Sequence, residues 1–280
     1  MKKQIGDLNV NYLAAGSGDP LLFLHGMGAR AQSFEEVIAI LSKDFSTYAI
    51  DQRGSGSTER PAEPKLSFEV WRDDVLRFLD SLGIERVVLA GWSLGAETAL
   101  HVALTAPRRV SHIIMIGAGS GPGVPSGDRS GFEARRKLIE SGASQEEIVA
   151  KTFDFTIKSM SADTQKNKPH VIEKVRREHL SNNPASYLEM IEASETRTDI
   201  GHRLKEITCP TLILCGDEDT RTPLVHSAAF NRAIASSYLK VIPDCGHHYG
   251  YEQPEATSRS ISNFVKAFDG KRNGSQSPSR

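Results

Sequence analysis

The sequence has little that would attach it to a membrane or a nucleic acid. Its first sixteen residues, MKKQIGDLNVNYLAAG, contain two lysines but no long apolar segment, so we expect neither a signal peptide nor a transmembrane helix. The 34 basic and 35 acidic residues leave a net charge of −1. This balance provides no basic surface for nucleic acid and no general attraction to an anionic membrane.

Cysteine is also scarce. The three cysteines, Cys209, Cys215 and Cys245, are odd in number and do not show a metal-ligand spacing. We therefore expect no disulfide framework and no bound metal, and we expect a reducing, cytoplasmic location.

Strand and helix patterns alternate along most of the 280 residues, a length that suits one large α/β domain. Residues 8–14 alternate in polarity, which predicts an antiparallel strand at an edge of the sheet. Buried strands are predicted within 20–26 and 85–91, and further strands within 46–54, 110–119, 209–219 and 237–246. Helices are predicted within 33–42, 67–82, 94–106 and the segment around 261–268. Such alternation predicts a mostly parallel sheet with helices on both faces.

The alternation of strand and helix patterns is interrupted once. Residues 119–131 are dense in glycine, proline and serine, and from about 129 to 200 the apolar spacing is helical only. We therefore predict a core whose first part is 1–119, a helical insertion at 120–203, and a second part of the core at 204–269. Residues 270–280 are polar and of low complexity, which predicts a disordered tail.

A glycine-flanked serine stands at the end of a predicted strand. Gly91-Trp92-Ser93-Leu94-Gly95 follows an apolar segment and opens a predicted helix. A sharp turn there would hold the Ser93 hydroxyl outward, and the flanking glycines would give it clearance. The pentapeptide alone does not distinguish a nucleophile from an incidental serine in a turn.

A serine nucleophile needs a base, and the base needs an orienting acid. His247 follows a predicted strand directly after a glycine, which favours it as the base over its neighbour His248. Asp219 stands three residues after Gly216 at another strand end and is our candidate acid, with Asp217 as the alternative. No carboxylate directly follows the strand predicted within 110–119.

A candidate oxyanion hole comes from two turns. His25-Gly26-Met27-Gly28 follows the strand predicted within 20–26. The backbone N–H of Met27, together with that of Leu94 after the serine, would supply two donors to an oxyanion. A tight turn without catalytic meaning is the alternative.

These motifs together resemble the α/β-hydrolase superfamily over roughly residues 5–268. They are the turn at 25–28, Asp51-Gln52-Arg53-Gly54-Ser55-Gly56, the serine turn at 91–95, Gly216-x-x-Asp219, Gly246-His247 and Glu252-x-Pro254-Glu255. The resemblance implies an eight-stranded, mostly parallel sheet and implies that the helical insertion caps the active site. Within this superfamily the chain resembles carboxylesterases and enol-lactone hydrolases, which implies a reaction that needs no metal or organic cofactor.

We therefore predict hydrolysis of a small-molecule ester or lactone, with a homodimer as one possible assembly. Asp51-Gln52-Arg53-Gly54 also resembles proline iminopeptidases, but these carry proline in the oxyanion turn and tryptophan after the serine. Carbon–carbon bond hydrolases typically carry asparagine where Trp92 stands and tryptophan where His248 stands. A small-molecule receptor on the same fold stays open as a further alternative.

The sequence also offers candidates for the substrate pocket. They are His25, Trp92, Phe153, Phe155 and His248. The alternative for the two phenylalanines, and the favoured one for most such residues of the insertion, is that they pack the helical insertion onto the sheet. Arg53 could bind a substrate carboxylate, or it could fix its own loop by local hydrogen bonds.

Overall fold

The computed structural model describes residues 1–125, 127 and 129–273, and within them eight strands form one sheet. The strands are β1 Lys2–Ile5, β2 Leu8–Ala15, β3 Asp19–Leu24, β4 Phe45–Ile50, β5 Val87–Trp92, β6 Val110–Ile116, β7 Thr211–Gly216 and β8 Ser237–Ile242. Their order across the sheet is β1-β2-β4-β3-β5-β6-β7-β8. β1 and β2 are antiparallel to their neighbours, and the strands from β4 to β8 in that order are parallel, which confirms the predicted fold class.

The helices connect these strands. They are α1 Glu35–Leu41, α2 Phe68–Ser81, α3 Leu94–Thr105, α4 Ser130–Glu140, α5 Gln145–Ile157, α6 Ala162–Asn167, α7 Pro169–Leu180, α8 Pro184–Thr196, α9 Leu224–Ala233, α10 Tyr249–Glu252 and α11 Pro254–Asn273. Short 3-10 turns cover η1 Ala31–Phe34, η2 Pro107–Arg109 and η3 Gly201–Glu206. α2 begins where the sequence predicts it, because the Ser67 hydroxyl accepts a hydrogen bond from the Val70 N–H.

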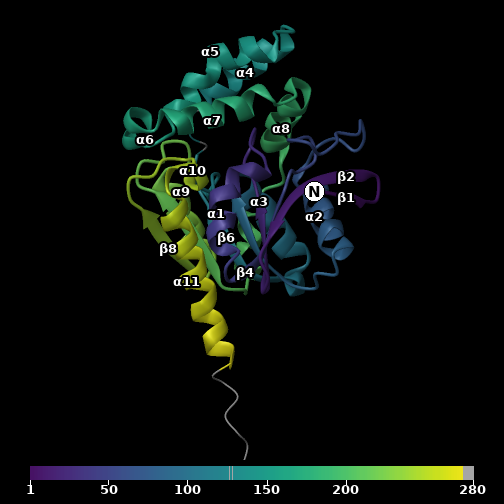
Figure 1. Cartoon of the computed structure of the whole chain (residues 1–280), viewed down its shortest axis with the longest axis vertical. Helices are drawn as coiled ribbons and strands as arrows, with labels where there is room; N and C mark the ends of the chain where they lie inside the picture. The colour runs from purple at the N-terminus through teal and green to yellow at the C-terminus, as the bar shows by residue number, and fades with distance from the viewer. Residues whose placement is uncertain (126, 128, 274–280) are drawn as a thin grey trace, which may run out of the picture.

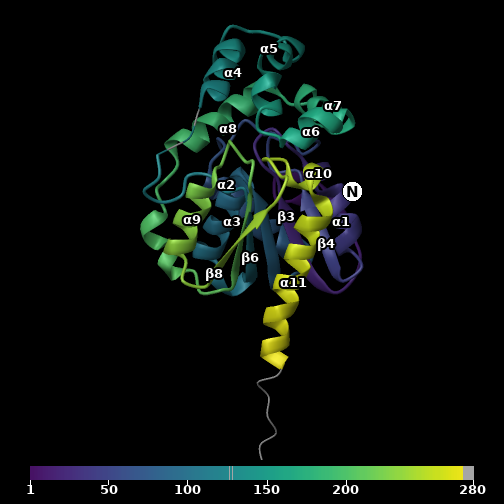
Figure 2. The same ribbon diagram turned by 90° about the vertical axis from the view of Figure 1, so that its left-hand side faces the viewer.

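Alternate side chains of each central strand face opposite sides of the sheet. In β3, Leu22 and Leu24 belong to a core with apolar residues of α2, α3 and α9, while Leu21 and Phe23 belong to a second core with residues of α1 and α11. These two groups of helices lie on opposite faces of the sheet (Figure 2). Burial on both faces explains why the strands read as continuous apolar runs in the sequence.

Helices α4 to α8 come between β6 and β7 in the chain and lie together beyond one end of the sheet (Figure 1). This is the end at which the parallel strands finish, so the turns after β3, β5, β7 and β8 lie between the sheet and these helices. Among the described residues, no helix combines the length and the apolar character needed to cross a bilayer.

Two expectations at the ends of the chain are wrong. β2 is not an edge strand, because β1 pairs with it on its outer side; β1 has only four residues and too little apolar pattern to reveal itself. The predicted tail also begins too early, since α11 continues through residues 270–273. The rest of that predicted tail, residues 274–280, lies outside the described residues.

Candidate active site

Two pairs of neighbouring strands bring the predicted site residues together. β3 and β5 are adjacent and in register, with Leu24 beside Gly91, so the Met27 turn lies next to the Ser93 turn. β7 and β8 are also adjacent, which places the segment with Asp219 beside the one with His247. Because all four strands are parallel, their carboxyl ends meet at the same edge of the sheet.

Ser93 occupies a strained turn between β5 and α3. Its φ of 54° and ψ of −115° are unusual for a residue that is not glycine. The flanking glycines are sterically required: a Cβ on Gly91 would lie 2.1 Å from the Gly95 carbonyl oxygen, and one on Gly95 would lie 2.2 Å from the Leu24 carbonyl oxygen. The sequence motif is thus explained by the close approach of α3 to β3 and β5.

Two cavities adjoin Ser93. The first, here called the His247 cavity, has an empty volume of about 500 Å³ including the space open to solvent, and its lining includes Met27, Trp92, Ser93, His247 and His248. The second, here called the Glu97 cavity, is lined by residues that include Met27, Ser93, Leu94, Glu97 and Thr222. Ser93 therefore stands where a molecule extending into both cavities would meet it.

The two backbone donors predicted for an oxyanion lie beside Ser93. Met27 lines both cavities and Leu94 lines the Glu97 cavity. Leu94 is the first residue of α3, and its N–H belongs to the first helical turn, where no intrahelical acceptor exists. The Ser93 hydroxyl does not cap this helix. The helix N-terminus can therefore offer its N–H groups and positive dipole end to a group bound at Ser93.

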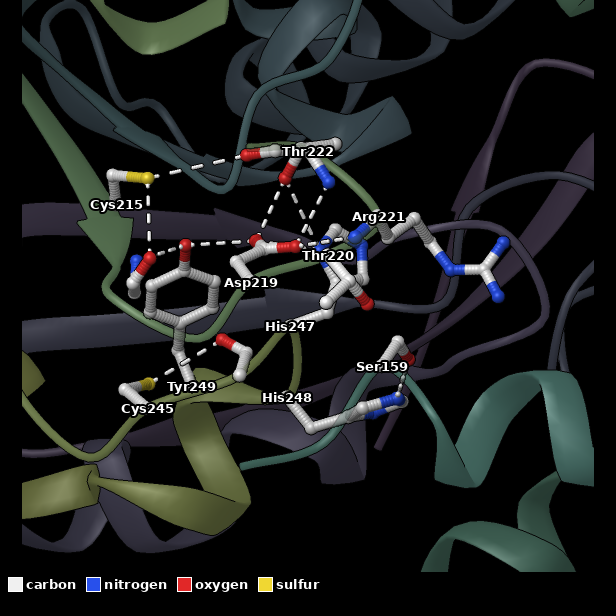
Figure 3. Close-up of polar contacts among 12 residues, drawn as sticks. Ser159, Cys215, Asp219, Thr220, Arg221, Thr222, Cys245, His247, His248 and Tyr249 are labelled. Atoms are coloured by element: carbon white, nitrogen blue, oxygen red, sulfur yellow. Dashed lines mark hydrogen bonds and ion pairs between the residues drawn. The ribbon is translucent and has the colours of Figure 1, made fainter. Parts of the chain in front are cut away.

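Asp219 is buried and surrounded by donors (Figure 3). Its Oδ2 atom accepts hydrogen bonds from His247 Nδ1 (2.9 Å), Thr222 Oγ1 (2.7 Å) and Tyr249 OH (3.0 Å). Its Oδ1 atom accepts from the N–H groups of Arg221 (3.0 Å) and Thr222 (2.8 Å). Burial by itself raises the pKa of Asp219, but His247 and the Thr222 donors outweigh burial and hold that pKa well below its usual range.

The orientation of the His247 ring follows from this partner. Since an ionised carboxylate only accepts, Nδ1 is the nitrogen that donates to Asp219, and Nε2 is the nitrogen that can act as a base in the neutral tautomer. The backbone N–H of His247 donates to the Ser159 carbonyl oxygen at 2.7 Å. A Cβ on Gly246 would lie 2.4 Å from that same oxygen, so the glycine before the histidine is needed for this contact.

Asp217 does not take the place of Asp219. It is exposed, and its Oδ1 atom accepts from the Cys245 N–H at 3.2 Å, which fixes the turn after β8. The end of β6 is closed to a carboxylate as well, because a Cβ on Gly117 would lie 2.7 Å from Tyr249 Cε2. The structure thus brings Asp219 to the histidine.

Trp92 and His248 line the His247 cavity, as predicted for the pocket. The Trp92 ring lies 5.6 Å from the His247 ring and 5.5 Å from the His248 ring, between centroids. Burial lowers the pKa of His248 well below its usual range, so this histidine is neutral. The His248 backbone N–H donates to Glu252, and the His248 Nε2 atom lies 3.5 Å from Ser159 Oγ. These contacts direct the His248 ring away from Asp219, the carboxylate that His247 contacts.

His25 does not belong to the pocket, contrary to the prediction. It is buried behind the turn, where its Nε2 atom accepts from the Gln52 N–H at 3.0 Å and its Nδ1 atom lies 2.8 Å from the Gly26 carbonyl oxygen. Burial lowers the pKa of His25, in keeping with a neutral ring that donates from Nδ1. His25 therefore holds the loops after β3 and β4 together.

Phe153 and Phe155 are also wrong as pocket residues. Phe153 packs in an apolar cluster among the insertion helices, with Val149 and Val175 as neighbours. Phe155 contributes its backbone carbonyl, which accepts from Arg221 Nη2 at 3.1 Å. Both take the alternative role of packing and tethering, and Phe132 is the phenylalanine that lines the two cavities.

Of the two roles suggested for Arg53, the structure shows hydrogen bonding within its own surroundings rather than a place in the substrate pocket. Its Nε and Nη2 atoms donate to the two carboxylate oxygens of Asp74 at 2.7 and 2.9 Å, and Asp7 lies 3.5 Å from its Nη1 atom. With 1% of its surface exposed, it fixes its own loop.

Sequence reasoning missed the residues that the insertion helices contribute. In the His247 cavity these are Phe132, Arg135, Thr156, Val175, Glu178, His179 and Tyr187. Two come from α4, one from α5, three from α7 and one from α8, and no sequence motif links them. The charged residues within an otherwise apolar helical pattern were the only signal available.

One of them, Glu178, is a buried carboxyl with a perturbed pKa. It accepts hydrogen bonds from Tyr251 OH and from Ser33 Oγ, which link α7 to α10 and η1. Burial raises the pKa of Glu178 to about 7, although Tyr251, Arg30 and Ser33 oppose that shift. The carboxyl is therefore partly protonated at neutral pH.

This shift predicts a pH-dependent stability. The pKa of Glu178 rises from 4.5 to about 7 on folding, so between these values the folded state binds more protons. Stability is therefore lost as pH rises through this window, by about 3 kcal/mol in total at about 1.4 kcal/mol per unit. A Glu178→Gln variant cannot titrate, and its free energy of unfolding should gain about that amount relative to the native protein between pH 5 and 8.

Urea unfolding at pH 5, 6, 7 and 8 measures this difference. Glu173→Gln is the matched control, because Glu173 stands on the same helix with 53% of its side chain exposed. The control should keep the native pH slope. Parallel stability curves for the Glu178→Gln variant and the native protein would show that the shift is absent.

Comparison with known proteins places this geometry in a family. A family model described as the alpha/beta hydrolase fold matches residues 19–254. The chain is 24% identical over 266 residues to 3-oxoadipate enol-lactonase 2 of Acinetobacter baylyi, covering 94% of this chain and 95% of that protein. It is 28% identical over 272 residues to 2-hydroxy-6-oxononadienedioate/2-hydroxy-6-oxononatrienedioate hydrolase 2 of Pseudomonas putida, with coverage of 93% and 92%.

A solved structure agrees with these relatives. The thermophilic esterase of Thermogutta terrifontis superposes with a TM-score of 0.86 at 26% identity, over 95% of this chain and 98% of that one. All three similarities extend over nearly the whole chain, and the family model spans the strands and turns that carry Ser93, Asp219 and His247. The chain is therefore a hydrolase that belongs to the α/β-hydrolase fold family.

Proposed function

We propose that the protein hydrolyses a carboxylic ester or lactone of a small molecule through a Ser93–His247–Asp219 triad. The observation that carries the proposal is the shared cavity: Ser93, held outward by a strained turn, lines it together with His247, whose Nδ1 atom is 2.9 Å from Asp219. A nucleophile, a base with a free nitrogen and an orienting carboxylate are the parts that acyl transfer requires.

The reaction proceeds in two halves. His247 Nε2 takes the Ser93 hydroxyl proton as the oxygen attacks the substrate carbonyl, and the ionised Asp219 stabilises the imidazolium that forms. The N–H groups of Met27 and Leu94 bind the oxyanion. His247 then gives its proton to the leaving alcohol, which leaves an acyl group on Ser93. Water, deprotonated by the same nitrogen, attacks this acyl group, and His247 returns the proton to the Ser93 oxygen as the acid leaves.

We assign the insertion helices α4 to α8 the role of a cap. Residues of four of these helices line the His247 cavity, and Gly28, in the oxyanion turn, lies directly beneath them. A Cβ on Gly28 would lie 2.8 Å from Tyr187 Cε2 and 3.4 Å from His179 Cε1. This packing restricts the site to small molecules that fit between cap and sheet.

Carbon–carbon bond hydrolysis is a second candidate, favoured by the similarity to the Pseudomonas putida hydrolase. Such a reaction would use the same serine but must protonate a leaving carbon. Trp92 and His248 stand where such enzymes typically carry asparagine and tryptophan. This difference favours hydrolysis of an ester or lactone over hydrolysis of a carbon–carbon bond.

A substrate panel separates the two. The purified protein is offered p-nitrophenyl esters, lactones, aminoacyl-anilides and a 2-hydroxy-6-oxodienoate, and kcat/KM is measured for each. We expect turnover of esters or lactones and little of the others. Turnover of the anilides alone or of the dienoate alone would contradict the proposal.

A further inference from the structure

One cavity residue is a buried cation for which the described residues supply no charged partner. Arg135, in α4, is 7% exposed and lines the His247 cavity. Its Nε atom donates to Thr152 Oγ1 and its Nη2 atom to Thr156 Oγ1, both at 3.0 Å, and its Nη1 atom donates to Tyr187 OH. Within the part of the chain that the structure describes, these hydroxyls are its acceptors and no carboxylate forms an ion pair with it.

Such an arrangement is costly unless an anion completes it. Hydroxyl oxygens satisfy part of the hydrogen bonding of a guanidinium but do not neutralise its charge, and a buried charge without a counter-charge is strongly unfavourable. Tethering α4 to α5 and α8 would not require a cation, because a neutral side chain could pack or hydrogen-bond there. The charge itself therefore calls for an explanation.

Glu178 does not supply the missing counter-charge. It is the one carboxyl among the described residues that line this cavity, and its oxygens accept from Ser33 and Tyr251. Burial raises its pKa to about 7, so near neutral pH it holds a proton in a large share of the molecules. Glu178 is thus engaged at the boundary of cap and core.

The cavity lining includes hydrogen-bond donors that have no acceptor among the described residues. A guanidinium carries five N–H donors, and the three bonds that the described residues provide leave two donors of Arg135 without an acceptor among those residues. Trp92 Nε1, buried on the same cavity, has no acceptor among the described residues. Arg221 adds a second cation to the lining, with its guanidinium 5.3 Å from the centre of the Phe132 ring.

Arg135 is also well placed relative to the proposed nucleophile. The hydroxyl of Tyr187 accepts from Arg135, and the ring of Tyr187 packs against Gly28 in the turn that carries Met27. One side chain therefore separates the guanidinium from the oxyanion turn. A group bound by Arg135 would belong to the same small molecule as a carbonyl at Ser93.

We propose that the substrate ester or lactone carries a carboxylate and that Arg135 binds this carboxylate while the scissile carbonyl lies at Ser93. The proposal rests on the proposed hydrolytic function. A carboxylate matches the paired N–H groups of a guanidinium and forms charge-assisted hydrogen bonds, which an amide or a methyl group at the same position cannot do.

The test compares two nearly isosteric esters. One is the mono-p-nitrophenyl ester of adipic acid, and the other carries a primary amide in place of the free carboxylate. The native protein should favour the carboxylate ester by about 10- to 100-fold in kcat/KM, the range for a hydrogen bond to a charged group. Arg135→Gln should abolish this preference, because it lowers kcat/KM for the carboxylate ester about 10- to 100-fold more than kcat/KM for the amide ester.

Arg136→Gln is the matched control. Arg136 follows on the same helix, is 25% exposed at its side chain and pairs with Glu195 outside the cavity. Its loss should leave the preference unchanged. A merely structural Arg135 would lower turnover of both esters together, so a retained preference in the Arg135→Gln variant contradicts the proposal.

Binding measurements keep the test independent of variant folding and of turnover. In calorimetry, adipate should bind the native protein and adipamide should bind at least about tenfold more weakly, since only adipate offers charged acceptors. Equal binding of the two contradicts the carboxylate proposal whether or not any ester is hydrolysed. Absence of ester turnover together with selective adipate binding would instead overturn the proposed hydrolysis and keep the anion site.

Discussion

Replacing Ser93 by alanine is expected to lower kcat for ester hydrolysis by about 10⁴- to 10⁶-fold, the range for removal of a serine nucleophile. The variant keeps the backbone donors of Met27 and Leu94, so weak residual catalysis above the rate in water should remain. The measurement is kcat on the best ester of the substrate panel. Labelling by a fluorophosphonate probe, followed by mass spectrometry of the modified peptide, reports the same hydroxyl directly.

Ser194→Ala is a suitable control for this experiment. Ser194 lines the Glu97 cavity together with Ser93, but its hydroxyl donates to the Ile191 carbonyl oxygen within α8. This variant should react with the probe as the native protein does. Undiminished esterase activity in the Ser93→Ala variant, or a probe attached to another serine of the native protein, would refute the mechanism.

The sequence predicts the parts of the site that sit at strand ends. Ser93, Asp219 and His247 each follow a strand within a few residues, and the carboxyl ends of parallel strands meet at one edge of the sheet whatever the details of packing. The sequence also predicts that the flanking glycines give the turn clearance. The structure agrees, since neither Gly91 nor Gly95 has space for a Cβ atom.

The cap side of the site could not be predicted in this way. Arg135, Glu178 and Tyr187 face the cavity because of how α4, α7 and α8 pack on one another and on the sheet. Helical periodicity reveals which side of a helix is apolar, but not which polar residue of that side meets a cavity. The same limitation explains why Phe153 was predicted for the pocket although it packs between helices.

His25 shows a different limit. Functional side chains often occur directly after a strand, where His25 stands. Nothing in the neighbouring residues shows whether its side chain lines the pocket or is buried and joins two loops by hydrogen bonds. The hydrogen bond from the Gln52 N–H decides the matter, and it depends on the loop after β4 reaching the loop after β3. Contacts between loops distant in sequence are outside the reach of spacing arguments.

Replacing Asp219 by asparagine should lower kcat by about 10⁴-fold, as is typical when the acid of a triad is made neutral. Oδ2 of Asp219 receives three hydrogen bonds and Oδ1 receives two, and an amide can offer an acceptor on only one side. Either His247 Nδ1 meets an N–H₂ group, which favours the wrong tautomer, or the Thr222 and Arg221 N–H groups lose their acceptor.

The stability of the variant should fall as well, by about 1–3 kcal/mol, the cost of leaving buried donors unsatisfied. Urea unfolding measures this loss, and kcat measured on protein that is shown to be folded separates it from the loss of catalysis. The matched change is Asp217→Asn, two residues earlier. Asp217 is exposed and accepts only from the Cys245 N–H among the described residues, so activity should stay close to native.

The pair of variants distinguishes the two acids that the sequence left open. A carboxylate that orients His247 must be ionised and in contact with Nδ1. His247 and the Thr222 donors outweigh burial and keep Asp219 in that state far below neutral pH. If Asp217→Asn were as damaging as Asp219→Asn, the cause would have to be the turn that Asp217 fixes, and unfolding curves would reveal it. If only Asp217→Asn abolished activity in a stable protein, Asp219 would not be the acid.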